Sequence, residues 1–203
     1  MDKGQLIALL KHEGFHERIV SAFEKVNRED FVLDNFKKLA YENISLPISH
    51  DQTMSQPSTI AISLSLLKLK ENHKVLEVGS GCGYTLALMS EVVGENGIVY
   101  GVEIVTDLAY DSLNNLTNYK NVNVYNQNGK VKIPEAPSFD RILVSAAVPE
   151  VPREILEQLK DDGIVVAPIG SRDIQTLTSI RRNGDEFVVE KELPGFIFVH
   201  FVD

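Results

Sequence analysis

The sequence predicts an α/β protein built on a mostly parallel sheet, and three observations lead to that prediction. Between residues 74 and 169, short apolar runs of strand length alternate with longer runs in which apolar residues recur at helical spacing. One apolar run leads directly into three closely spaced glycines, and a helical run follows. Two later strand-like runs are joined by Asn183-Gly184, a strong hairpin signal. Alternating strands and helices imply right-handed crossovers and parallel pairing, whereas the hairpin adds an antiparallel pair at the end.

The N-terminal part is expected to be helical. Apolar residues recur at helical spacing over residues 3–40, and Gly14 separates two short helices there. Residues 41–56 show no clear period and are expected to be irregular. The run 57–69 is predicted as a helix, because Pro57 suits a first turn and apolar residues follow on one stripe.

The alternating region supplies the sheet. Its strands are expected at residues 74–78, 97–103, 121–125, 139–145 and 163–169. The helices between them are expected at residues 84–93, 106–118 and 151–159. We expect a single domain over residues 1–203, in which residues 1–56 supply N-terminal helices and a substrate-side loop and residues 57–203 form the core.

Composition excludes several function classes. A net charge of −9, from 29 acidic and 20 basic residues, argues against a nucleic-acid backbone as main partner. The single cysteine, Cys82, excludes an internal disulfide and a cysteine-based zinc site. No apolar run approaches the roughly 20 residues that span a membrane, and the start lacks a signal-peptide pattern. We therefore expect a cytoplasmic protein with no nucleic-acid or membrane partner. A monomer is expected as well, although the composition does not determine the oligomeric state.

The glycine cluster in "VLEVGSGCGY" is the strongest chemical signal. A predicted strand runs into Gly79, Gly81 and Gly83, and glycines let the backbone turn sharply and approach a ligand. The helix that follows offers free backbone N–H groups to polar ligand atoms. The next predicted strand ends in Glu103, where a carboxylate can accept both hydroxyls of a ribose. The pattern predicts a nucleoside cofactor at the carboxyl end of the parallel sheet.

The spacing of the glycines in this cluster limits which class of nucleoside cofactor is expected. Tyr84 stands where a dinucleotide fingerprint has its third glycine, which disfavours a nicotinamide-dependent oxidoreductase. The cluster reads G-x-G-x-G preceded by Glu77, and this resembles the S-adenosylmethionine loop of class I methyltransferases. Glu77 would repel a pyrophosphate but suits a cationic sulfonium and amino-acid ligand. No Lys-Ser or Lys-Thr pair follows, so the cluster is not a phosphate-binding P-loop, and a turn that binds nothing is the remaining alternative.

Several segments resemble protein-L-isoaspartate O-methyltransferases. They are "YENISLPISHDQTMSQPSTIA", "VLEVGSGCGY", "FDRILVSAAVPEVP" and "GIVVAPIG", and "VNREDFV" is similar to that family's V-P-R-E-x-F-V. The resemblance covers about residues 15–201, and T-x-S-Q-P together with A-A-x-P-E-V-P is its most specific part. It implies a Rossmann-like class I methyltransferase fold, with a mostly parallel seven-stranded sheet whose last strand is reversed.

The resemblance also implies an activity, methyl transfer from S-adenosyl-L-methionine to the α-carboxylate of L-isoaspartyl residues in damaged proteins or peptides, with S-adenosyl-L-homocysteine as product. By the same resemblance Ser55 is the active-site serine and Thr53 the neighbouring donor. The residues implied for the cofactor are Glu77, Gly79, Ser80, Gly81, Gly83, Glu103, Ile104, Asn128 and Gly129.

The chemistry fits such a site. A carboxylate is ionised at neutral pH, with a pKa near about 4, so it needs donors that orient it and neither a base nor a metal.

Three alternatives stay open from the sequence. Ser55 could be only a helix N-cap, since it stands just before Pro57. The protein could instead methylate aspartate on a dedicated peptide or protein partner, or it could be a non-catalytic S-adenosylmethionine-binding module.

The chain departs from the family's pattern at a few places. Asn128 stands where Asp is usual, and Asn43 replaces the aspartate of Y-E-D. Residues 49–51, Ser-His-Asp, replace the usual glycines before the T-x-S-Q-P segment, and His200 stands near the end where V-P-L is usual. These positions are where we expect the protein to differ from its relatives.

Overall fold

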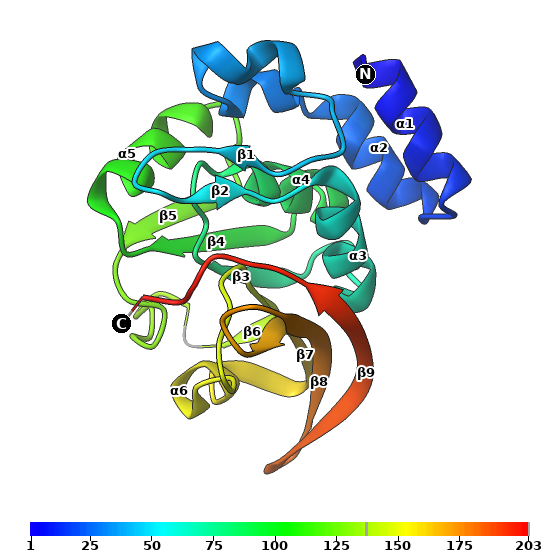
Figure 1. The fold of residues 1–203 in the computed structure, drawn as a ribbon. Helices are drawn as coiled ribbons and strands as arrows, with labels where there is room; N and C mark the ends of the chain where they lie inside the picture. Colours follow the sequence, from blue (N-terminus) through cyan, green and yellow to red (C-terminus); the bar gives the residue numbers. More distant parts are fainter. Residues whose placement is uncertain (137, 203) are drawn as a thin grey trace.

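The computed structural model describes residues 1–136 and 138–202. Its centre is a seven-stranded sheet with the order β5-β4-β3-β6-β7-β8-β9 (Figure 1). The strands are β3 (Lys74–Val78), β4 (Ile98–Glu103), β5 (Val122–Asn126), β6 (Phe139–Val144), β7 (Leu159–Gly170), β8 (Gln175–Asn183) and β9 (Glu186–Phe196). The helices are α1 (Lys3–His12), α2 (Glu17–Lys25), α3 (Pro57–Leu67), α4 (Tyr84–Val93), α5 (Thr106–Asn115) and α6 (Arg153–Leu156). Two 3₁₀ helices, η1 (Arg28–Phe31) and η2 (Asp34–Leu39), and a small hairpin, β1 (Leu46–Pro47) with β2 (Thr53–Met54), lie between α2 and α3.

The predicted fold class is confirmed, with one correction to the strand directions. β3 to β7 pair in parallel, β8 is antiparallel to β7, and β9 is antiparallel to β8. The reversed strand is therefore β8, and the last strand, β9, runs with the majority. The reason is connection length: four residues join β7 to β8 and two join β8 to β9, and links this short allow only antiparallel neighbours.

Side chains of the central strands alternate between two hydrophobic clusters. In β3, Val75 belongs to the cluster under α3 and α4, whereas Leu76 and Val78 belong to the cluster on the other face. Both faces of a parallel sheet are covered, so its strands are apolar on both sides. Glu77 breaks this pattern, because it is a carboxylic acid at a position only 1% exposed. The sequence of β3 thus places one ionisable group inside the core, just before the glycine turn.

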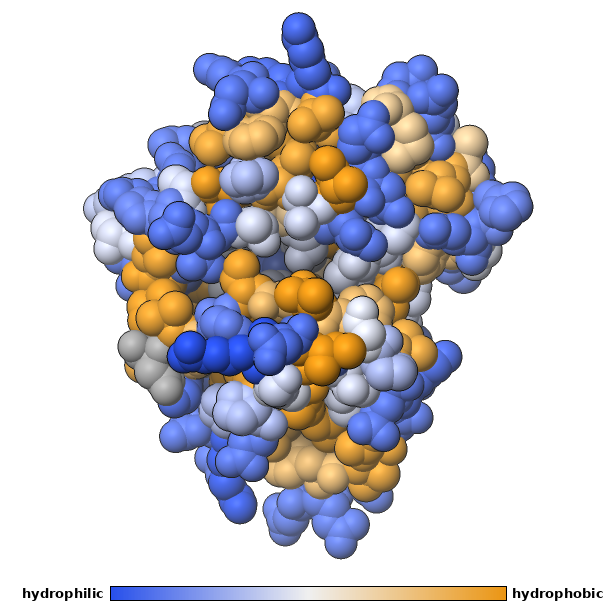
Figure 2. Space-filling model, in the orientation of Figure 1, coloured by the Kyte–Doolittle hydropathy of each residue, from blue (hydrophilic) through white to orange (hydrophobic). Residues whose placement is uncertain are grey.

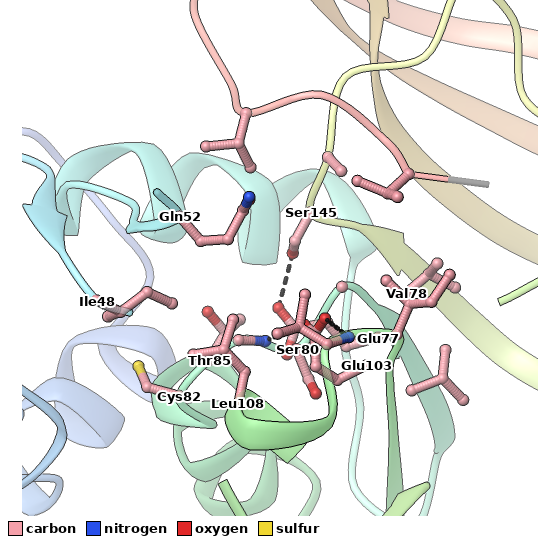
Figure 3. A pocket seen from close by; sticks show the side chains of 18 of the residues that line it. Ile48, Gln52, Glu77, Val78, Ser80, Cys82, Thr85, Glu103, Leu108 and Ser145 are labelled. Atoms are coloured by element: carbon pink, nitrogen blue, oxygen red, sulfur yellow. Dashed lines mark hydrogen bonds between the residues drawn. The ribbon is translucent and has the colours of Figure 1, made fainter. Parts of the chain in front are cut away.

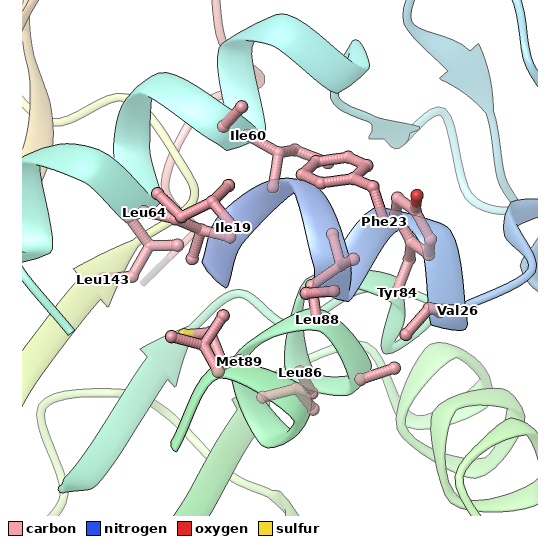
Figure 4. Close-up of a cluster of buried hydrophobic side chains, with 14 of the residues drawn as sticks. Ile19, Phe23, Val26, Ile60, Leu64, Tyr84, Leu86, Leu88, Met89 and Leu143 are labelled. Atoms are coloured by element: carbon pink, nitrogen blue, oxygen red, sulfur yellow. The ribbon is translucent and has the colours of Figure 1, made fainter. Parts of the chain in front are cut away.

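The N-terminal helices form a further layer outside α3 and α4. α2 packs on both of those helices, and α1 packs on α2. Figure 4 shows Ile19 and Phe23 of α2 facing Ile60 of α3 and Tyr84 of α4, within one cluster of buried side chains. Phe23 meets the Tyr84 ring edge-on, with 6.3 Å between the ring centroids. The N-terminal helices therefore share the core of the α3–α4 layer.

Several predicted boundaries differ from the structure, among them the strand expected at 163–169, which begins at Leu159, and the helix expected at 106–118, which ends at Asn115. The helix expected at 151–159 is shorter, because the Phe139 N–H donates to the Gln158 carbonyl and draws the chain into β7 from Leu159. The region expected to be irregular, 41–56, contains the β1–β2 hairpin. The helical run expected to reach residue 40 ends at Lys25 as α-helix and continues as the two 3₁₀ helices. Within residues 1–136 and 138–202, no helix is long and apolar enough to cross a membrane.

Candidate active site

A cavity lies at the carboxyl ends of β3, β4 and β6. Its empty space, counted together with the open solvent at its mouth, is about 830 Å³. One wall is the β1–β2 hairpin, which lies across the front of the sheet in Figure 1, and another is the C-terminal segment 199–202. Figure 2 shows apolar side chains gathered across the middle of this face, where the C-terminal segment crosses. Ligands of open α/β sheets bind at this edge.

The glycine turn forms the floor of the cavity. Gly79, Gly81 and Gly83 have φ angles of 81°, 52° and 88°, in the left-handed region that favours glycine. Gly83 is the N-cap of α4, and a Cβ atom there would lie only 2.6 Å from the Ser112 Oγ atom of α5. Gly83 does not line the cavity, and the close approach of the backbone to α5 is what requires a glycine at this position.

Glu77 projects from β3 toward the cavity and is fully buried (Figure 3). Its Oε1 atom accepts a 2.7 Å hydrogen bond from the Ser145 hydroxyl. Its Oε2 atom has no hydrogen-bond partner among the described residues. Burial raises the pKa of Glu77 to about 8, the Ser145 hydrogen bond opposes that rise, and the negative charge of Glu103 adds to it. A cationic group beside this carboxylate would favour its ionised form and satisfy the orphaned oxygen.

Glu103 ends β4 on the same floor. Its Oε2 atom accepts from the Gly81 backbone N–H and its Oε1 atom from the Val105 backbone N–H, each at 2.9 Å. Each carboxylate oxygen keeps a further lone pair, so both can still accept the hydroxyls of a ribose. Ile104 follows on the cavity wall, and Ser80 lies in the turn itself. The structure thus brings the predicted methionine-end and ribose-end residues together around one cavity.

The segment predicted to contact an adenine lies at the side of the cavity. Gln127 and Gly129 line it, and between them the Asn128 Oδ1 atom accepts a 2.9 Å hydrogen bond from the Lys130 backbone N–H. A Cβ atom at Gly129 would lie 2.3 Å from Val78, so this turn sits tightly on β3. The role of Asn128 toward a base stays a prediction.

Thr53, in β2, and Ser55, just before α3, also line the cavity. The alternative that Ser55 caps α3 is wrong. The N-cap is Gln56, which stays extended at φ −63° and ψ 148° and makes no side-chain cap. The Ser58 backbone N–H, in the first turn of α3, donates a 3.0 Å hydrogen bond to the Asn43 Oδ1 atom, so a side chain from a distant segment takes the place of an N-cap. The helix therefore begins without help from the Ser55 side chain, and Ser55 lines the cavity.

A second hollow, the adjoining groove, opens from the same mouth. It shares Thr53, Ser55, Ser145 and Val199 with the cavity. Its remaining walls are Ser45, Gln56, Thr59, Ile62 and residues 195–198. None of these described lining residues is charged. Ser55 thus stands where a ligand in the cavity and a ligand in the groove would meet.

Sequence reasoning missed several residues of the site. Ser145 follows β6, and its place after a central parallel strand is a signal that could have found it. Residues 199–202 line the cavity because the Ala147 N–H donates to the Val199 carbonyl and the Phe201 N–H to the Ala147 carbonyl. No local sequence pattern predicts this pairing between segments that are distant in the chain. Ile48 and Gln52 of the hairpin also line the cavity.

His50 lies at the tip of the hairpin, where Ser49-His50-Asp51 departs from the family's glycines. His50 and Asp51 have φ angles of 59° and 56°, unusual for residues other than glycine. The His50 Nε2 atom lies 2.9 Å from the Asp107 Oδ2 atom in the first turn of α5. This contact ties the hairpin to α5 across the edge of the cavity.

Comparison with known proteins points to one family. A family model described as Protein-L-isoaspartate(D-aspartate) O-methyltransferase (PCMT) matches residues 1–203. The protein-L-isoaspartate O-methyltransferase of Methanococcoides burtonii is 39% identical, over 97% of this chain and 98% of its own. That of Methanothrix thermoacetophila is 41% identical, over 100% of this chain and 95% of its own.

Solved structures agree. A protein-L-isoaspartate O-methyltransferase structure superposes with a TM-score of 0.90 at 30% identity, over 98% of this chain and 65% of that one. A putative protein-L-isoaspartate O-methyltransferase from Plasmodium falciparum, in complex with S-adenosyl-L-homocysteine, has a TM-score of 0.87 at 25% identity, over 100% and 99%.

Proposed function

Because the chain belongs to the protein-L-isoaspartate O-methyltransferase family, we propose that Ser55 and Thr53 orient the substrate carboxylate in its active site. The protein is an S-adenosylmethionine-dependent enzyme that methylates L-isoaspartyl residues of damaged proteins and thereby initiates their repair. The observation that carries the residue assignment is the shared mouth: Ser55 and Thr53 line both the cavity and the uncharged adjoining groove.

The cavity residues fit the cofactor. S-adenosylmethionine supplies an electrophilic methyl group on a positively charged sulfur. We propose that Glu77, with its orphaned Oε2 atom, holds the cationic amino-acid end, together with Ser80 and the glycine turn. Glu103 holds the ribose with the free lone pairs of its two oxygens, and Ile104 packs beside it. The turn at Asn128 and Gly129 holds the base.

The chain's task toward the substrate is orientation. The α-carboxylate of an isoaspartyl residue carries its own lone pair and is ionised, so no proton has to move to make it a nucleophile. The Ser55 and Thr53 hydroxyls donate hydrogen bonds that aim one carboxylate oxygen into the cavity. The hairpin and the C-terminal segment cover the cavity and limit the water that would otherwise solvate this weak nucleophile.

A labelled-methyl assay tests the assignment. Ser55→Ala should lower turnover on an isoaspartyl peptide on the order of a hundred-fold, the scale for losing one orienting donor, while S-adenosylhomocysteine affinity stays unchanged. Ser45→Ala is the matched control, because it removes a hydroxyl from the adjoining groove away from the cavity. Equal turnover of Ser55→Ala and the wild type would refute the role of Ser55. The same peptide with ordinary aspartate should accept no methyl groups.

We also propose that residues 1–203 form a single domain and that the enzyme acts as a monomer in the cytoplasm, without a nucleic-acid partner. One hydrophobic cluster that runs from α1 to β8 supports the single domain. The net charge of −9 supports the absence of a nucleic-acid partner. Light scattering on the purified protein tests the monomer, and a single cooperative unfolding transition tests the single domain.

A further inference from the structure

Arg28 is a fully buried arginine in η1, with 0% of its surface exposed. Within residues 1–136 and 138–202, the acceptors of its guanidinium hydrogen bonds are all backbone carbonyls. Nη1 donates to Ala40 at 2.9 Å and to Glu42 at 3.0 Å, and Nη2 donates to Ile44 at 3.0 Å and to Ser55 at 3.1 Å. One side chain thus collects four carbonyls from a single later stretch of chain, the segment that ends at Ser55.

The buried charge of Arg28 is stabilised without a paired carboxylate. Among the described residues no carboxylate forms an ion pair with it, and its Nε atom has no partner. The Tyr84 ring lies beside the guanidinium, with the Cζ atom 5.8 Å from the ring centroid. Burial lowers the pKa of Arg28, yet a guanidinium stays charged in proteins. Burying a cation is expensive unless its donors are satisfied, so the carbonyl contacts stabilise Arg28 as much as Arg28 stabilises the segment.

The segment from residue 40 to residue 55 has little regular structure of its own. Its only strands, β1 and β2, are two residues each. A planar guanidinium presents its donors in a fixed fork, so four carbonyls bound to it are fixed relative to one another. The bond to the Ser55 carbonyl fixes the backbone of Ser55, which lines both the cavity and the adjoining groove.

We propose that Arg28 is a positioning residue for methyl transfer, whose guanidinium holds the substrate-side segment so that the Ser55 hydroxyl faces the cavity. This inference rests on the proposed role of Ser55. Arg28 acts through the backbone of Ser55 and touches neither the floor of the cavity nor the adjoining groove. Glu77 and Glu103 are held by the sheet instead, so the loss of the fork should leave cofactor binding largely intact.

Arg28→Lys keeps a cation near Tyr84 and removes the fork, because an ammonium group is a single point donor. The matched control is Arg141→Lys. Arg141 is likewise buried, at 8% exposed, and donates to the Leu67 carbonyl at 2.7 Å and the Asp140 carbonyl at 2.6 Å, but it lies at the start of β6, away from the cavity mouth.

The experiment measures three quantities on wild type and both variants: stability, S-adenosylhomocysteine affinity by calorimetry, and kcat on an isoaspartyl peptide. Turnover is expressed per binding-competent molecule from the calorimetric stoichiometry, so partial unfolding cannot imitate a catalytic defect. Both variants should lose stability and keep the affinity within about three-fold. Only Arg28→Lys should lose kcat, by about ten-fold to a hundred-fold, because misplacing a positioned group by about an ångström can cost about a hundred-fold.

A double-mutant cycle with Ser55→Ala separates this inference from the proposed function. If Arg28 acts through Ser55, Arg28→Lys should lower kcat little further in the Ser55→Ala background. A kcat of Arg28→Lys within about two-fold of wild type, an equal loss in Arg141→Lys, or full additivity with Ser55→Ala would each overturn the inference. Failure of Ser55→Ala alone to change kcat would instead overturn the proposed role of Ser55.

Discussion

Replacing Glu77 by Gln should make the protein more stable and a poorer binder of its cofactor. Burial raises the pKa of Glu77 from its ordinary value of 4.5 to about 8. A raised pKa in the folded state means that the contribution of Glu77 to stability is complete below pH 4.5 and is lost as pH rises through about 8. Each pH unit in that interval removes about 1.4 kcal/mol, so the whole interval removes on the order of 4 to 5 kcal/mol. Glutamine stays neutral and can still accept from the Ser145 hydroxyl.

Urea unfolding of wild type and Glu77→Gln at a series of pH values tests this. Other titrating groups are common to both proteins, so the difference between their free energies of unfolding isolates Glu77. That difference should grow in favour of Glu77→Gln from about pH 5 to about pH 8. S-adenosylmethionine should bind Glu77→Gln more weakly, because the carboxylate that meets its cationic end is gone. Parallel stability curves across the range would refute the reasoning.

Three further predictions concern the β1–β2 hairpin, the glycine turn and the two Asn-Gly pairs. His50→Ala should raise the S-adenosylhomocysteine Kd by no more than about five-fold, because the contact with Asp107 is largely exposed and worth about 0.2–1 kcal/mol; a larger change in calorimetry would contradict that estimate. Gly83→Ala should destabilise the protein by about 1–3 kcal/mol in thermal unfolding, since the left-handed backbone is strained by a side chain; an unchanged Tm would count against the tight approach to α5. On prolonged incubation Asn183, exposed at a hairpin tip, should deamidate before Asn128, whose carboxamide is bonded in a turn; peptide mass mapping that finds the opposite order would contradict this.

The parts of the fold that could be predicted depend on local patterns. β3 matches its predicted bounds, because a strand buried on both faces is mostly apolar and this one ends at a glycine that the turn requires. The β8–β9 hairpin follows from Asn183-Gly184 in the same way. The approach of Glu103 to the glycine turn was also predictable, because the carboxyl ends of parallel strands meet at one edge.

Contacts between distant segments could not be predicted. The bonds from Arg28 reach backbone carbonyl groups 12 to 27 residues away. Every residue has such a carbonyl group, so residue type does not indicate which ones Arg28 binds. The pairing of residues 199–202 with Ala147 is likewise a matter of backbone geometry. The direction of β9 follows from the two short connections, between β7 and β8 and between β8 and β9, each of which reverses the chain. The family resemblance alone did not give this direction.

The uncharged walls of the adjoining groove have a consequence for how substrates compete. A wall without charge exerts no local electrostatic preference among the residues that flank a damaged site. Long-range attraction still acts, because the protein as a whole carries a charge of −9. Encounter with acidic proteins is therefore slowed and encounter with basic proteins accelerated, and salt weakens both effects. The net charge of a damaged protein, rather than the charges beside its damaged residue, should therefore set how fast it meets the enzyme, and ionic strength should set how large that difference is.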